Sequence, residues 1–203
     1  MNENSSTDSY KSISKSSTGI YKELGSKFLS FAYPVSSEEE IKNIISDLRK
    51  DYFDARHHCY AYRLGILGEV WRANDDGEPS STAGKSILGQ LMSYDISDIL
   101  VVVVRYFGGV KLGIPGLIRA YRSATVDAIS NNEIVEKVAN RNLTFSFDYL
   151  KMNSIMKLIK DFSATIKEQE FDNVCIIKIN IRQSSHMKFS EAVQEAGGTI
   201  ITS

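Results

Sequence analysis

Hydrophobic residues are most concentrated in residues 99–128, ILVVVVRYFGGVKLGIPGLIRAYRSATVDA. Residues 98–107 are apolar at both alternating sets of positions, which predicts a central β-strand covered on both faces. Gly108 and Gly109 follow this strand and predict a tight turn. Pro115 is then expected to be the first residue of a helix, whose buried stripe recurs at helical spacing as Leu117, Ala120, Tyr121, Ala124 and Ala128.

The chain before this segment alternates between strand and helix patterns. Residues 24–35 are rich in aromatic and aliphatic residues and predict a strand. Residues 36–50 carry apolar side chains at helical spacing, begin with two serines and have glutamates three positions later, which predicts a helix with a capping box. Residues 55–67 predict a second strand, residues 70–81 a loop, and residues 82–94 a helix with Thr82 as its N-cap.

The pattern restarts after residue 142. Alternating positions in residues 143–149 predict a strand, and a short amphipathic helix follows. Two further strands, a second helix ended by a Gly-Gly pair and a final strand complete the order βαββαβ. This order is that of the ferredoxin-like split βαβ plan. We therefore expect an α+β protein, with a partly disordered N-terminus (residues 1–15), a first domain (residues 16–138) and a ferredoxin-like domain (residues 142–203).

Composition narrows the class of protein. The formal net charge of the 203 residues is -1, so any nucleic-acid binding must come from a local patch. The two cysteines, far apart in sequence, give no disulfide framework, and we expect no disulfide-linked partner. No apolar run is long enough to span a bilayer, and the N-terminus has no apolar signal region. The chain is expected to be cytoplasmic, without a membrane partner.

The first candidate site is the glycine-rich segment that joins the central strand to its helix. It is rich in Lys and Arg and has no acidic residue between Asp98 and Asp127. Helix N-termini and glycine-rich turns offer backbone N–H groups to anions, although such turns are also common without ligands. The candidate anion- or nucleic-acid-binding residues are Arg105, Gly108, Gly109, Lys111, Gly113, Gly116, Arg119 and Arg122.

The second candidate site is a polar cleft near the acidic turn DDGE of residues 75–78. Three neighbouring carboxylates can bind Mg²⁺, cap helices or form ion pairs with the basic segment, and solvated or capping carboxylates are the commonest case. The backbone N–H groups at the start of the next helix offer a weaker anion site. The candidate residues are His57, His58, Asp75, Asp76, Glu78, Thr82 and Lys85.

A metal site is not expected. Adjacent strand residues point to opposite faces, so only His57 and Cys59 of the run His57-His58-Cys59 can share a metal. Two ligands are too few for a zinc site. The sequence gives no sign of a cofactor.

Four motifs together resemble the IMPACT family in its bacterial form. They are HHCYAY (residues 57–62), DDGEP (residues 75–79), TAG (residues 82–84) and RYFGGVKLG (residues 105–113). The resemblance covers nearly the whole chain from about residue 16. It implies a first domain similar to the second domain of ribosomal protein S5, an α/β sandwich, and a ferredoxin-like second domain. Eukaryotic members regulate translation, and the resemblance leaves the role of the bacterial members undefined.

Three functions follow as hypotheses. The first is a translation-associated regulatory protein that binds RNA or the ribosome through the basic glycine-rich loop. The second is an enzyme or sensor for a small anionic, phosphorylated ligand in the cleft between the acidic turn and this loop. The third is a protein–protein adaptor that uses the ferredoxin-like sheet. No catalytic constellation is visible, and the residues do not decide whether the protein is an enzyme.

Overall fold

The computed structural model describes residues 8–202, which divide into two compact units. Of the described residues, one unit comprises residues 10–137, and the other comprises residues 138–202 together with residues 8 and 9. Part of the segment expected to be disordered, residues 1–7, lies outside the described residues. The rest of that segment contains strand β1 (Ser9–Ile13), which forms a two-stranded sheet with β7 (Ile134–Val138).

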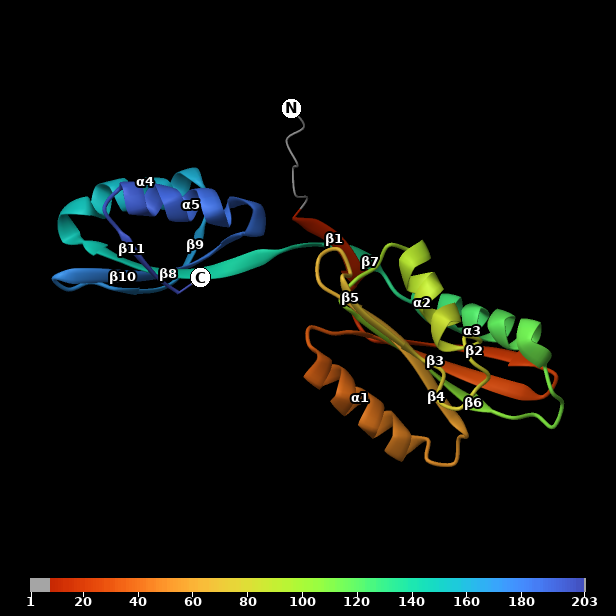
Figure 1. The fold of residues 1–203 in the computed structure, drawn as a ribbon. Helices are drawn as coiled ribbons and strands as arrows, with labels where there is room; N and C mark the ends of the chain where they lie inside the picture. The colour runs from red at the N-terminus through yellow and green to blue at the C-terminus, as the bar shows by residue number, and fades with distance from the viewer. Residues whose placement is uncertain (1–7, 203) are drawn as a thin grey trace. The chain divides into compact units, whose positions relative to one another are not determined.

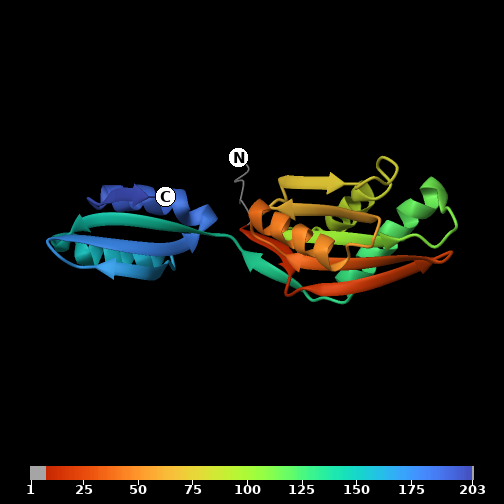
Figure 2. The ribbon, with the colours of Figure 1, turned by 90° about the horizontal axis from the view of Figure 1, so that it is seen from below.

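The first unit is built on a five-stranded antiparallel sheet with the order β2-β3-β6-β4-β5. Figures 1 and 2 show one helix, α1 (Glu38–Asp51), on one face, and the helices α2 (Gly84–Ser93) and α3 (Gly113–Ser130) on the other face. The strands are β2 (Ser17–Glu23), β3 (Ser26–Pro34), β4 (His57–Leu64), β5 (Val70–Asn74) and β6 (Ile99–Tyr106).

Strand β6 is the middle strand of this sheet, as its apolar pattern predicts. Val101 and Val103 pack into the core beneath α2 and α3, whereas Val102 and Val104 pack into the core beneath α1. A strand that contributes to two cores has no polar face, which explains why its sequence is apolar throughout. The first unit therefore has two hydrophobic cores, one on each face of its sheet.

The predicted capping of α1 is confirmed. The Ser37 hydroxyl accepts a hydrogen bond from the Glu40 backbone N–H at 3.2 Å, and the Glu40 carboxylate accepts one from the Ser36 N–H at 2.8 Å. These contacts satisfy N–H groups that have no partner within the helix. Arg49 and Lys50 lie in the last turn, where the helix dipole favours cations.

Three expectations for the first unit are wrong in detail. Residues 70–74 form the edge strand β5 and not a loop, because its backbone pairs with β4 although its side chains are mostly exposed and show no alternation. Helix α2 begins at Gly84, and Thr82 does not cap it; the Thr82 hydroxyl donates to the Pro79 carbonyl at 2.7 Å. Pro115 is the third residue of α3 and not the first.

The second unit has the βαββαβ order expected from the sequence. Its four-stranded antiparallel sheet has the order β11-β8-β10-β9, and both long helices cover one face of it (Figure 1). Phe145, Ile177 and Phe189 are fully buried between the sheet and the helices. The elements are β8 (Asn140–Asp148), a 3₁₀ turn (Tyr149–Lys151), α4 (Met152–Asp161), β9 (Thr165–Glu170), β10 (Val174–Arg182), α5 (Gln183–Glu195) and β11 (Thr199–Thr202).

No helix within residues 8–202 is both long enough and apolar enough to cross a membrane.

Candidate functional site

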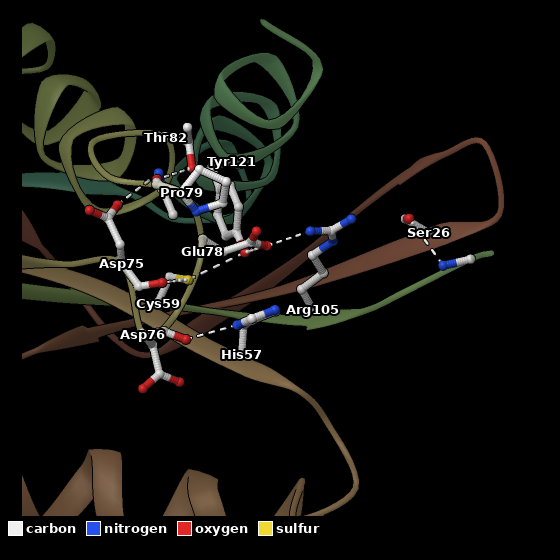
Figure 3. Close-up of polar contacts among 12 residues, drawn as sticks. Ser26, His57, Cys59, Asp75, Asp76, Glu78, Pro79, Thr82, Arg105 and Tyr121 are labelled. Atoms are coloured by element: carbon white, nitrogen blue, oxygen red, sulfur yellow. Dashed lines mark hydrogen bonds and ion pairs between the residues drawn. The ribbon is translucent and has the colours of Figure 1, made fainter. Parts of the chain in front are cut away.

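The motif residues of the first unit meet at one end of its sheet. Strand β4 begins there, β6 ends there, and the hairpin between β2 and β3 turns there, as the register pairs His57 with Arg105 and Lys27 with Tyr106. The acidic turn (residues 75–78) and the glycine-rich loop (residues 107–113) lie at the same end. Figure 3 shows the polar contacts among these segments.

Arg105 and Glu78 form an ion pair inside the protein. The Arg105 Nη1 lies 2.5 Å from the Glu78 Oε1, and their side chains are 7% and 3% exposed. The same Oε1 accepts a hydrogen bond from the Tyr121 hydroxyl at 2.7 Å. The guanidinium also lies 5.4 Å from the ring centre of Phe28 and 5.7 Å from that of Phe107. Glu78 therefore neutralises Arg105, which is the ion-pair alternative considered for the acidic turn, and the guanidinium charge is not free for a ligand.

Cys59 and Tyr121 continue this buried polar group (Figure 3). The Cys59 Sγ lies 3.0 Å from the Asp75 carbonyl oxygen and 3.3 Å from the Tyr121 hydroxyl. Burial raises the pKa of the Cys59 thiol far above its ordinary value, and the Glu78 carboxylate nearby raises it further. Burial also raises the pKa of the Tyr121 hydroxyl, and the nearby Cys59 and Glu78 raise it further. Both groups are therefore protonated at neutral pH, and the thiol is not a nucleophile there.

Asp75 is the anion that meets the N-terminus of α2. Its Oδ1 accepts hydrogen bonds from the backbone N–H groups of Ala83 at 3.0 Å and Gly84 at 2.8 Å, and its Oδ2 accepts one from Ser81 at 2.8 Å. A carboxylate in this position satisfies N–H groups that the helix leaves unpaired. The weaker anion site expected at the start of this helix is thus filled by the protein itself.

Removing the Asp75 carboxylate should destabilise the protein. We expect Asp75→Ala to lower the free energy of unfolding by about 2 kcal/mol, because three backbone N–H groups lose their acceptor. Urea denaturation followed by circular dichroism measures this change. Glu39→Ala is the control, since Glu39 is exposed in the first turn of α1, and it should change stability by less than about 0.5 kcal/mol. Equal unfolding midpoints for the two variants would contradict the capping role.

Asp76 joins the acidic turn to α1. Its Oδ1 lies 2.6 Å from the Arg49 Nη2, and its Oδ2 accepts a hydrogen bond from the His58 backbone N–H at 2.6 Å. Burial opposes ionisation of Asp76, but the hydrogen bonds from Arg49 and His58 outweigh it and lower the pKa of the carboxyl. The Asp76 side chain therefore acts as a structural anion and is not free to bind a metal ion or a proton at neutral pH.

The two histidines have different surroundings. The His57 Nδ1 lies 2.8 Å from the Asp76 carbonyl oxygen, which only accepts, so Nδ1 carries a proton. His58 points to the other face of the sheet and is buried. Burial lowers its pKa, and the charge of Arg49 lowers it further. His58 is therefore neutral at pH 7 and lies away from His57.

Gly108 holds the loop against the neighbouring hairpin. Its N–H donates to the Ser26 hydroxyl at 3.1 Å (Figure 3), and a Cβ at this position would lie 1.9 Å from the Gly25 carbonyl carbon. This N–H is consequently used inside the protein. Gly109 differs, because its φ is +89° and nothing lies within 4 Å of its Cβ position. Glycine is needed at 108 for close packing and at 109 for backbone conformation.

An open pocket lies between the acidic turn and the glycine-rich loop, and we call it the loop pocket. Its volume is about 510 Å³. Phe107 and Ile114 are 51% and 58% exposed beside it, and Lys111 is also exposed. Its lining residues are Arg56, His57, Gly77, Glu78, Pro79, Arg105, Phe107, Lys111, Leu112, Gly113, Ile114 and Leu117. The pocket thus combines an apolar surface with cationic and hydrogen-bonding side chains.

Five of the candidate residues line the loop pocket: His57, Glu78, Arg105, Lys111 and Gly113. The others do not. Arg119 is exposed on α3 and pairs with Glu23 of β2, and Gly116 is buried within α3. Arg122 and Lys85 are exposed on α3 and α2. Among residues 8–202, no group of three or more His, Cys, Asp or Glu side chains is placed to hold a metal ion.

Comparison with known proteins decides the family. The sequence model of the Impact N-terminal domain matches residues 24–129. The chain is 34% identical over 170 residues to IMPACT family member YvyE of Bacillus subtilis, a match covering 84% of this chain and 78% of YvyE. This chain belongs to the IMPACT family. It is also 29% identical over 167 residues to IMPACT family member YigZ of Escherichia coli, covering 81% of this chain and 82% of that protein.

A solved structure shares the fold of this IMPACT-family protein. It is a crystal structure described as that of a hypothetical protein, with a TM-score of 0.69 and 24% sequence identity. The match covers 96% of this chain and 97% of the other. The two-unit α/β architecture is therefore found in another protein.

The loop pocket lies entirely within the part of the chain that matches the IMPACT domain, residues 24–129. Seven of its twelve lining residues were not among the candidates from the sequence, and two of these, Arg56 and Phe107, could contact a ligand directly. Phe107 could have been predicted as a site residue, because it is a large apolar residue directly after a buried strand and before two glycines. Arg56 could not, because a lone arginine before a strand is most often a solvated side chain.

Proposed function

We propose that this IMPACT-family protein is a translation-associated regulator that binds RNA, free or in the ribosome, at the loop pocket. One observation carries the proposal. Lys111 and Arg56 are exposed at the pocket, neither takes part in an ion pair among the described residues, and an exposed aromatic ring, Phe107, lies with them. Cations that contact phosphate and an aromatic ring on which a base stacks are the two elements of single-strand binding.

The hydrogen bonds of the acidic turn support this proposal. Glu78 is used by Arg105, Asp76 by Arg49, and Asp75 by the start of α2. None of these three carboxylates is within ion-pair distance of Lys111. The turn therefore neutralises the buried cation and leaves the exposed ones available to a phosphate. Lys111 also precedes α3, whose N-terminal dipole favours an anion in the same place.

The fold assignment belongs to the same proposal. We assign residues 16–138 to a domain like the second domain of ribosomal protein S5 and residues 142–203 to a ferredoxin-like domain. The second assignment is supported by the βαββαβ order and by the sheet order, in which the fourth strand lies beside the first. Both domain types occur in the translation machinery, which agrees with the role of the eukaryotic members of the family.

Lys111 provides the test of RNA binding. We expect Lys111→Gln to weaken binding of a fluorescent single-stranded RNA of about 12 nucleotides by about tenfold, and to lower the slope of log affinity against log salt by about 0.7, the effect of one phosphate contact on a single strand. Fluorescence anisotropy between about 50 and 200 mM salt measures both.

The control is Lys42→Gln. Lys42 is exposed on α1, away from the pocket lining, and its replacement makes the same change in net charge. Its affinity should equal that of the wild type. Equal affinities for Lys111→Gln and Lys42→Gln, or no RNA binding by the wild type, would refute the proposal.

A second candidate function is recognition of a small phosphorylated ligand, for which the volume of the pocket is suitable. A mononucleotide at a hundredfold excess over its Kd would stabilise the protein by about 2.7 kcal/mol.

A further inference from the structure

We infer that the ligand of the loop pocket is a chain of nucleotides and not a single one, because a second cationic site at the end of the same sheet is suited to its next phosphates. This inference rests on the proposed function. The second site is a cross-strand row, which comprises Lys22, Lys27 and Tyr106 and which we call the lysine row. Lys22 of β2 pairs with Lys27 of β3, and Lys27 pairs with Tyr106 of β6.

The lysine pair is unfavourable for the folded protein alone. Side chains of directly paired residues in antiparallel strands lie on one face and close together, so like charges repel by a few tenths of a kcal/mol or more. Both lysines are exposed, and neither is in an ion pair among the described residues. Glu23, next to Lys22 in sequence, pairs with Arg119, and no carboxylate among the described residues lies within ion-pair distance of either lysine. A bound anion would remove this repulsion.

The lysine row adjoins the loop pocket. Phe107 lines the pocket and directly follows Tyr106 of the row. The hairpin that carries the lysines is joined to the glycine-rich loop by the Ser26–Gly108 hydrogen bond. Phe28, beside Lys27, points toward α3, so Lys27 points to the opposite face of the sheet. A ligand that uses both sites therefore passes around the end of β6.

Only an extended polyanion fits that arrangement. A mononucleotide held at Lys111 has no second phosphate to place on the other face of the sheet. A single strand of RNA is flexible, carries one charge per nucleotide and exposes its bases, so it can place a base on Phe107 and adjacent phosphates on Lys22 and Lys27. The occupant we assign is accordingly single-stranded RNA.

The test compares ligand length in two matched double variants. Lys22→Gln with Lys27→Gln should weaken binding of a single-stranded RNA of about 12 nucleotides by about thirtyfold and lower the salt slope by about 1.4, the effect of two phosphate contacts. The same variant should bind adenosine 5′-monophosphate as the wild type does. Lys15→Gln with Lys42→Gln removes the same charge from exposed positions outside the row and should change neither affinity. Urea denaturation should show the row variant to be no less stable than the wild type.

The outcomes separate this inference from the proposed function. Loss confined to the longer RNA supports the lysine row. If the wild type binds the mononucleotide and the longer RNA with equal affinity, and both affinities depend on Lys111, then the loop pocket binds the ligand but the lysine row does not. Binding of polyglutamate that depends on Lys22 and Lys27, with unchanged RNA affinity, overturns RNA as the occupant. Absence of binding to every nucleotide ligand overturns both proposals.

Discussion

Glu78→Ala is expected to lower the free energy of unfolding by about 3–5 kcal/mol, the effect of leaving a buried charge without its partner. The Arg105 side chain is 7% exposed, and the Glu78 carboxylate is the only acid in an ion pair with it among residues 8–202. The variant also removes the acceptor of the Tyr121 hydroxyl. Denaturant unfolding monitored by circular dichroism measures the loss, which is a large fraction of the stability of a typical domain.

Two further variants test the cause. Asp47→Ala breaks the exposed Asp47–Lys50 pair, whose side chains are 68% and 72% exposed, and should cost less than about 1 kcal/mol. Glu78→Leu combined with Arg105→Met removes both buried charges and should recover at least half of the loss, because apolar replacements of a buried pair are often close to neutral. A double variant as unstable as Glu78→Ala would show that the loss comes from packing and not from the unpaired guanidinium.

Gly108→Ala is expected to destabilise the protein by about 3 kcal/mol, the upper part of the usual range for overpacking. The added Cβ would lie 1.9 Å from the Gly25 carbonyl carbon and 2.1 Å from the Ser26 nitrogen. These are backbone atoms, so relief requires the β2–β3 hairpin to move away from the loop. The Gly108–Ser26 hydrogen bond would be lost in that movement.

The control for this substitution is Gly89→Ala. Gly89 lies within α2, and nothing lies within 4 Å of its Cβ position. Alanine in a helix interior is favoured over glycine by about 1 kcal/mol, so this variant should be slightly more stable than the wild type. Thermal unfolding of the two variants should therefore shift in opposite directions. If both shift alike, the close approach of Gly108 to the hairpin does not limit stability.

Contacts within the protein limit which residues of the RYFGGVKLG motif are available to a ligand. Arg105, the first residue of the motif, is neutralised inside the protein, and the N–H of Gly108 is used by Ser26. Lys111 is the cation of the motif that stays exposed, and it is joined by Arg56 from the start of β4. The groups exposed to a ligand are therefore Phe107 and Lys111 of the motif and Arg56, which lies outside it.

The sequence by itself determined the elements whose side-chain periodicity is strong. Strand β6, the buried stripe of α3, the capped helix α1 and the βαββαβ order of the second unit all follow from local patterns of apolar and capping residues. The family also follows from short motifs in one stretch of chain. These features were predictable because each depends on neighbours within a few residues.

Only the tertiary structure decided the partners of the charged residues. Asp75, Asp76 and Glu78 are neighbours in sequence, yet one caps α2, one pairs with Arg49 of α1 and one pairs with Arg105 of β6. Edge strand β5 could not be predicted from the sequence either, because it is defined by its pairing with β4 and not by alternation of its side chains. Contacts of this kind join segments far apart in sequence, and their geometry depends on how the sheet brings those segments together. Lys22 and Lys27 are close in sequence, but they face each other only because the turn of the β2–β3 hairpin fixes their register, and β6 adds Tyr106 to the row.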